Sequence, residues 1–189
     1  MYIEISTYRY FGEGRLRRPL HVMWQEQNLV EYSIEFADRL IEAAESFVTK
    51  TSPSDEVGRT VLYLSLLSCE ISIKALLERA GYTLEELKKR SHDLNGLLKD
   101  ICACELTDTR IGNSLPLSAS RLLSQEVVAS TSNGTVGALL SAESVGASKY
   151  PNDIRYGELV THFPPLIMLS CAKVVSKWAN DNLEQIKRK

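Results

Sequence analysis

The first half of the chain carries the spacing of apolar residues that is typical of packed helices. From Gln25 to Lys50, apolar residues recur at steps of three and four, with charged residues mostly between them. This pattern predicts an amphipathic helix that buries one face. The stretch that follows is apolar on nearly every face between Val61 and Leu77 and stops at Gly81. A helix that is apolar all round is predicted to be the central, buried one.

Local signals predict where the next helices begin. Ser52 offers a capping side chain, followed by Pro53 at the first helical position and Asp55 at the third, so the central helix is expected to start there. Thr83 and Glu86 have the spacing of a capping box, which predicts a short helix. A third main helix of about three turns is expected from its apolar positions, which are Leu94, Leu97, Leu98 and Ile101. The short connections favour antiparallel neighbours.

Two regions flank or interrupt this helical pattern. Residues 1–24 alternate between apolar and polar positions around a Gly-Glu-Gly turn, which predicts a small N-terminal β-hairpin appended to the helices. The segment at about 105–150 is rich in Ser, Thr, Gly and Ala, and we interpret it as a loop insertion in which only 118–130 has a helical pattern. Pro164 and Pro165 then open a last helix that is expected to run through Ile186, ahead of a basic run at 187–189 that favours a helix C-terminus.

Composition narrows the class of protein. The 189 residues suit one domain, and 44% hydrophobic with 24% charged residues is typical of a globular chain with a core. The net charge of -2 gives no global positive field, so any contact with nucleic acid must come from a local patch. No stretch reaches the ~18 uninterrupted apolar residues of a membrane helix, and the first residues lack a signal-peptide pattern. We therefore expect a cytoplasmic protein with no membrane contact.

Several common chemistries find no support. The four cysteines are too few and too scattered for a disulfide framework, and we interpret Cys69 and Cys171 as reduced core thiols. Three histidines and the Cys102-x-Cys104 pair match no common zinc spacing, so no metal site is expected. Gly-rich phosphate loops and Gly-x-Ser-x-Gly elbows do not occur, and no cofactor is expected.

Charged residues inside the apolar pattern are the first candidates for a site. Glu70 and Lys74 stand four residues apart on the central helix, where their side chains can meet. Buried charges must be paired, so they form either an ion pair that fixes helix register or a polar floor shared with a ligand or another chain. His92 and Asp93 begin the third main helix, where Asp93 suits the helix dipole and His92 can take part in the cap.

Four of these features together resemble the HEPN superfamily, the higher-eukaryote and prokaryote nucleotide-binding domains. The features are Glu70-x3-Lys74-Ala75-Leu76-Leu77, Gly81 at the end of that helix, His92-Asp93-Leu94 at the start of the next, and Ile154-Arg155-Tyr156 before the final helix. The resemblance implies an up-and-down bundle of four to five helices, commonly a homodimer. It also implies polar core or pocket roles for Glu70, Lys74, His92, Asp93 and Tyr156. Nucleotidyltransferases and effector proteins of toxin-antitoxin and defence systems are the partners that it suggests.

Some HEPN members are metal-independent RNases that use an Arg, four to six further residues and a His. Arg155 and His162 are separated by six residues and fit that spacing. In the family, the His acts as general acid or base and the Arg stabilises charge on the phosphate. Here Gly157 lies in the interval and Phe163 precedes a proline, so we expect the last helix to begin after His162 rather than before Arg155. Arg155-Tyr156 equally matches the Arg-Tyr pair of non-catalytic relatives, which packs before the last helix.

Three functions therefore follow as hypotheses. The first is a HEPN-like module that binds nucleotides or RNA, the second a metal-independent endoribonuclease using Arg155 and His162 at a dimer interface, and the third an interaction module that uses no nucleic acid. Two short basic clusters offer phosphate contacts, although such runs are commonly solvated faces. The clusters are Arg15-Arg17-Arg18 and Lys88-Lys89-Arg90.

Overall fold

The computed structural model describes residues 31–107, 116–130, 132–145, 150–156 and 164–189. The N-terminal hairpin predicted for residues 1–24, the first basic cluster and His162 lie outside the described residues. Within the described residues the chain is mainly α-helical, with two small antiparallel sheets. The mainly α prediction is confirmed.

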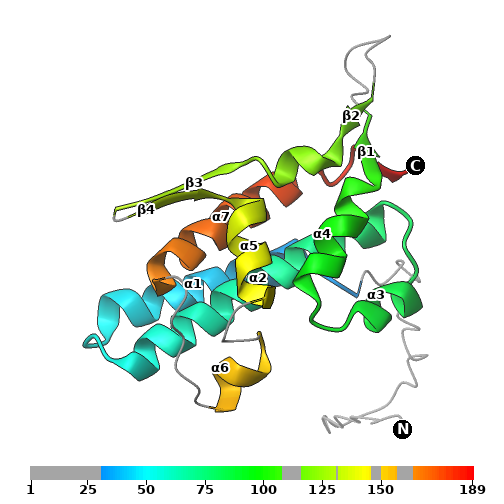
Figure 1. Ribbon diagram of the computed structural model, residues 1–189. Coiled ribbons are helices and arrows are strands. Elements are labelled where there is room, and N and C mark those ends of the chain that lie inside the picture. Colours follow the sequence, from blue (N-terminus) through cyan, green and yellow to red (C-terminus); the bar gives the residue numbers. More distant parts are fainter. Residues whose placement is uncertain (1–30, 108–115, 131, 146–149, 157–163) are drawn as a thin grey trace, which may run out of the picture.

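Three long helices form the body of the molecule: α1 (Ile34–Lys50), α2 (Asp55–Arg79) and α7 (Pro165–Asn182). All three pack against one another and lie side by side in Figure 1. The start of α1 lies near the ends of α2 and α7, so α1 runs antiparallel to both, while α2 and α7 run in the same direction. The long connection between α2 and α7 permits this parallel packing, whereas the short α1–α2 loop imposes the antiparallel one.

The central position predicted for the second helix is confirmed. Fourteen of the residues of α2 are buried, including the serines and both charged residues of its middle turns. Among the described helices α2 alone is long and apolar enough to cross a membrane, but 78% of its most apolar window is buried inside the protein. Its hydrophobicity is therefore that of a core helix packed between α1 and α7.

The start of α2 differs from the prediction. The capping residue is Ser54 rather than Ser52, and its side chain accepts a hydrogen bond from the backbone N–H of Val57. Helix begins at Asp55, which places Asp55 and Glu56 in the first turn, where the helix dipole favours carboxylates. At the other end, Gly81 adopts a φ of 101°, a conformation that favours glycine and ends the helix as predicted.

The two helices after Gly81 agree closely with the prediction. α3 (Leu84–Arg90) carries the predicted capping box between Thr83 and Glu86, with both reciprocal hydrogen bonds present. α4 (Leu94–Cys102) buries its predicted apolar positions against α2. Cys69 and Cys171 are free and buried, as the reduced core thiols were expected to be.

The loop insertion predicted at about 105–150 is wrong for the described part of that segment, which contains short regular elements. They are β1 (Cys104–Leu106), β2 (Leu117–Ser118), the 3-10 helix η1 (Ala119–Leu122), β3 (Glu126–Ala129), β4 (Ser132–Thr135) and α5 (Val136–Val145). The helix predicted for 118–130 is replaced by η1 and β3, because Val127 turns inward and Val128 outward in a strand paired with β4. Strands this short contain too few residues for a periodicity to show.

The end of the last helix also differs from the prediction. α7 begins at Pro165, as the two prolines indicated, but it ends at Asn182. Ile186 lies instead in β5 (Ile186–Arg188), which pairs antiparallel with β1, so the basic run at 187–189 does not cap a helix. A separate short helix, α6 (Asn152–Tyr156), precedes α7 and contacts α2. The predicted break between Arg155 and the last helix is confirmed.

Candidate functional site

Glu70 and Lys74 form a buried ion pair in the middle of α2. The Lys74 ammonium donates to Glu70 Oε1 at 2.7 Å, and the two side chains are only 4% and 5% exposed. Lys74 also donates to the backbone carbonyl of Ser91 at 2.6 Å and lies 5.2 Å from the centre of the Tyr32 ring. Because both charges are on one helix, the pair alone cannot fix a register between helices. Its further partners tie other segments to α2.

The second carboxylate oxygen of Glu70 accepts two more hydrogen bonds. Tyr150 donates its hydroxyl to Glu70 Oε2 at 2.8 Å, and His92 Nδ1 lies 2.9 Å from the same atom. The imidazole stands edge-on to the Tyr150 ring, with the ring centres 5.8 Å apart. One carboxylate therefore joins α2 to the turn before α4 and to the segment before α6.

The turn that this carboxylate holds is strained. Ser91 has a φ of 48°, in a region that residues with a side chain rarely adopt. The bond from Lys74 to its carbonyl, together with the bond between its neighbour His92 and Glu70, holds the turn against α2. Such strained positions persist only where the surroundings determine the conformation.

The contacts continue outward to the surface. The Tyr150 and Tyr63 rings lie 6.0 Å apart. Arg155 donates from Nε and Nη2 to the Tyr63 hydroxyl at 3.1 and 2.5 Å, and its guanidinium lies 5.2 Å from the Tyr63 ring centre. We call this connected set the α2 polar network; its members are Glu70, Lys74, His92, Tyr150, Tyr63 and Arg155.

The surroundings of Tyr150 and Arg155 keep both side chains protonated. Burial raises the pKa of Tyr150, and the negative charge of Glu70 and the hydrogen bond to it raise it further, so its hydroxyl stays a neutral donor. The hydrogen bond to Tyr63 raises the pKa of Arg155, which remains a cation. Among the described residues, the hydrogen-bond partner of this cation is the Tyr63 hydroxyl, which holds the guanidinium in place.

Of the five residues predicted to have polar core or pocket roles, the structure brings three together. Glu70, Lys74 and His92 come together, whereas Tyr156 is 82% exposed and lies outside the core. Asp93 does not join the network either, because its side chain caps α4 by accepting from the Gly96 N–H at 2.9 Å.

Sequence reasoning missed the two tyrosines of the network. Tyr63 stands seven residues before Glu70, which is two helical turns and hence the same face of α2. That spacing could have marked it. Tyr150 precedes a proline in a turn, and nothing in the sequence placed it beside Glu70.

The basic cluster on α3 is largely engaged in ion pairs. Arg90 makes a bidentate pair with Asp100, with two bonds of 2.7 Å, which fastens the end of α3 to α4. Lys88 lies 3.7 Å from Glu31 in an exposed pair. Lys89 is exposed. The predicted phosphate contact at this cluster therefore stays a prediction, and its strongest donor is committed to a structural bond.

Three side chains in or next to the network reach the surface. Arg155 is exposed and is followed by the 82% exposed Tyr156, and the His92 side chain is 39% exposed. In the described ranges, no cluster of three or more His, Cys, Asp or Glu side chains is placed to hold a metal ion. These three side chains supply a cation, an open aromatic ring and a partly exposed imidazole.

Comparison with known proteins found no matching family model, no matching curated protein and no matching solved structure.

Proposed function

We propose that this protein is a HEPN-like helical module that binds single-stranded RNA or nucleotides at the surface around Arg155 and Tyr156. The observation that carries the proposal is an exposed guanidinium held by the Tyr63 hydroxyl and followed in the chain by an exposed tyrosine ring. The order of the four sequence features that resemble HEPN proteins supports the same class.

Each part of this surface suits a different part of a nucleotide. Guanidinium groups bind phosphate oxygens through paired N–H donors, and Arg155 keeps its full charge for such a contact. Exposed aromatic rings stack on bases irrespective of sequence, and Tyr156 offers such a ring. Recognition of single strands commonly combines these two contacts.

The α2 polar network explains how the surface is held in place. Tyr63 fixes the Arg155 side chain, and Tyr63 lies on the buried helix that also binds Tyr150 through Glu70. Side chains that are held before a ligand arrives lose less conformational freedom on binding. The network therefore serves as a support for the surface, while the contacts with the ligand come from its outer end.

Binding of a fluorescent single-stranded RNA of ten nucleotides, measured by anisotropy in EDTA, tests the proposal. We expect Arg155→Ala to weaken binding about tenfold and to reduce the salt dependence by about one phosphate contact. Tyr156→Ala should weaken it about 5- to 100-fold through lost stacking. Arg39→Ala and Phe36→Ala are matched controls, because both residues are exposed on α1. Equal affinities for the Arg155 and Arg39 variants would contradict the proposal.

The same samples examine the catalytic hypothesis. RNA products are separated on a gel after incubation in EDTA, with His162→Ala beside Arg155→Ala. Cleavage by the wild type that is lost in both variants would make this protein a metal-independent endoribonuclease. Binding without cleavage would leave it a binding module.

Partnership is part of the same proposal. The resemblance implies a homodimer and a nucleotidyltransferase or defence effector as partner. Light scattering coupled to size-exclusion chromatography of the full chain measures the first: a mass near twice 21.2 kDa is expected, and a monomer would contradict it.

A further inference from the structure

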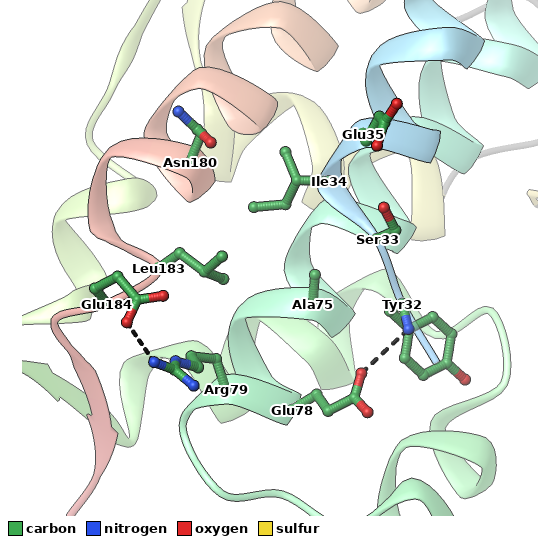
Figure 2. A pocket seen from close by; sticks show the side chains of 10 residues that line it. All are labelled: Tyr32, Ser33, Ile34, Glu35, Ala75, Glu78, Arg79, Asn180, Leu183 and Glu184. Atoms are coloured by element: carbon green, nitrogen blue, oxygen red, sulfur yellow. Dashed lines mark hydrogen bonds and ion pairs between the residues drawn. The ribbon is translucent and has the colours of Figure 1, made fainter. Parts of the chain in front are cut away.

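A pocket of about 550 Å³ lies where α1 begins and where α2 and α7 end. Figure 2 shows Ile34 and Leu183 near its centre, with Ala75 of α2 below Ile34. Pockets of about 300 to 1,000 Å³ with apolar walls and a few fixed polar groups are typical of small-ligand sites. The size and floor of this pocket meet that description.

The polar groups of the pocket give it a charge. Three carboxylates line it, from Glu35, Glu78 and Glu184, against one guanidinium, from Arg79, so the lining carries a formal charge of -2. An apolar floor below a negative rim is complementary to a molecule that joins an aliphatic chain to a cationic group.

One of these carboxylates is fixed before any ligand arrives. Glu78 accepts the backbone N–H groups of Glu31 and Tyr32, at 3.1 Å each, one on each oxygen. A carboxylate has about four acceptor positions, so each oxygen keeps the capacity for one further donor. Figure 2 shows this side chain below Tyr32.

The second fixed feature is an ion pair at the edge of the pocket. Arg79 pairs with Glu184, joining the end of α2 to the segment after α7. Both side chains are more than half exposed, at 54% and 74%, so a competing cation can reach the carboxylate. Arg79 therefore opposes a cationic ligand, while Glu184 attracts it.

We propose that this pocket binds an organic cation with an aliphatic stem, as found in free guanidines and amines or in the arginine side chain of a peptide. The stem packs on Ile34 and Leu183, and the cationic head lies at the negative rim near Glu184. This inference uses residues outside the α2 polar network and is independent of RNA binding.

Isothermal titration of the full chain with agmatine, a four-carbon chain with a guanidinium at one end and an ammonium at the other, tests the proposal, and N-butylurea provides an uncharged comparison of the same chain length. Agmatine should bind in the millimolar range or tighter, and N-butylurea should not bind. At low salt we expect Glu184→Gln to weaken agmatine binding about fivefold and Arg79→Gln to strengthen it by a similar factor. The change of opposite sign in two exposed residues cannot arise from a general loss of folding.

Further variants locate the binding. Asn180→Trp places a large ring at the rim, from an exposed position on α7, and should abolish binding. Glu126→Gln on the exposed face of β3 is the matched charge control and should leave binding unchanged. Equal binding of agmatine and N-butylurea, or no effect of Glu184→Gln and Arg79→Gln, would overturn the proposal.

A last arm separates the two sources of the cation. Acetyl-Leu-Arg-amide is titrated in parallel with agmatine. Stronger binding of the peptide assigns the pocket to an arginine-bearing protein segment, and stronger binding of agmatine assigns it to a free metabolite of this chemistry. Failure of both to bind at millimolar concentration would overturn the proposal, whatever the result with RNA.

Discussion

Helix α2 takes part in two ion pairs that differ in burial and in the number of their further partners, although each joins a basic side chain to a glutamate. Lys74 and Glu70 are 5% and 4% exposed, and their pair is joined by Ser91, His92 and Tyr150. Arg79 and Glu184 are 54% and 74% exposed and bridge two chain segments at the protein surface. A buried charge needs every partner, because water cannot replace one, whereas an exposed charge exchanges a partner for water at little cost.

Because of this difference in burial, the two pairs have different roles in the protein. The buried pair connects the middle of α2 to the turn before α4 and to the segment before α6, so its loss affects several elements at once. The exposed pair is easily opened, which suits the edge of a pocket that admits a cation.

Removing the buried carboxylate should have the largest effect. Glu70→Ala leaves the Lys74 ammonium buried without a counter-charge, and we expect the free energy of unfolding to fall by about 3 to 5 kcal/mol. Urea denaturation followed by circular dichroism measures it. The double variant Glu70→Leu/Lys74→Met, which leaves no unpaired charge, should lose less than the single variant. A loss below about 1 kcal/mol in the single variant would contradict the assigned role.

Removing one hydrogen-bond donor to the Glu70 carboxylate should lower the free energy of unfolding by a smaller amount. Tyr150→Phe keeps the ring but deletes the hydroxyl that bonds to Glu70, and hydrogen bonds to charged groups contribute about 1.5 to 3 kcal/mol. The matched control is Tyr82→Phe, whose hydroxyl makes a long 3.4 Å contact with the backbone carbonyl of Asp100 and none with a carboxylate among the described residues. If the control loses as much stability as Tyr150→Phe, the hydrogen bond to Glu70 does not account for the loss in the Tyr150 variant.

The same tyrosine should make stability depend on alkaline pH. Its pKa is raised in the folded protein, so its stabilising contribution is fully present below the unfolded value of about 10 and is lost as pH rises above it. The loss from this group should approach about 1.4 kcal/mol per pH unit. Unfolding by urea at pH 9 and pH 11 should show a larger drop for the wild type than for Tyr150→Phe. Equal drops would mean that Tyr150 does not carry the effect.

Opening the exposed pair should have the smallest effect. Arg79→Ala is expected to lower the free energy of unfolding by less than about 1 kcal/mol, because the partners are solvated and screened. The difference from wild type should shrink further when the urea experiment is repeated in high salt. A loss as large as that of Glu70→Ala would show that exposure does not separate the two pairs.

The sequence predicted the elements that depend on neighbouring residues better than those that depend on residues far apart in the chain. The helices that follow capping and periodic patterns were found, including the capping box at Thr83 and the stop at Gly81. The strands β1, β2 and β5 were missed, because each has two or three residues and exists only through pairing with a distant partner. The same reason explains why Ile186 was assigned to a helix.

The candidate site shows the same limit. Glu70 and Lys74 were marked by their unusual position in an apolar helix, and the structure confirms that they bond to each other. The resemblance gave a polar core or pocket role to Tyr156, whereas the tyrosine that contacts Glu70 is Tyr150 and Tyr156 is exposed. Local spacing cannot tell which of two nearby tyrosines turns inward.

Two conclusions follow from the sequence alone: the protein is mainly helical with one central apolar helix, and the two charges on that helix must be paired. Both conclusions rest on local periodicity and on the cost of burying a charge, which act wherever the chain folds. Tertiary structure alone decided that one carboxylate joins three segments, that Arg155 rests on Tyr63, and that a negative pocket forms where three helix ends meet. These features need residues far apart in the chain to come together, and such contacts leave no periodic trace in the sequence.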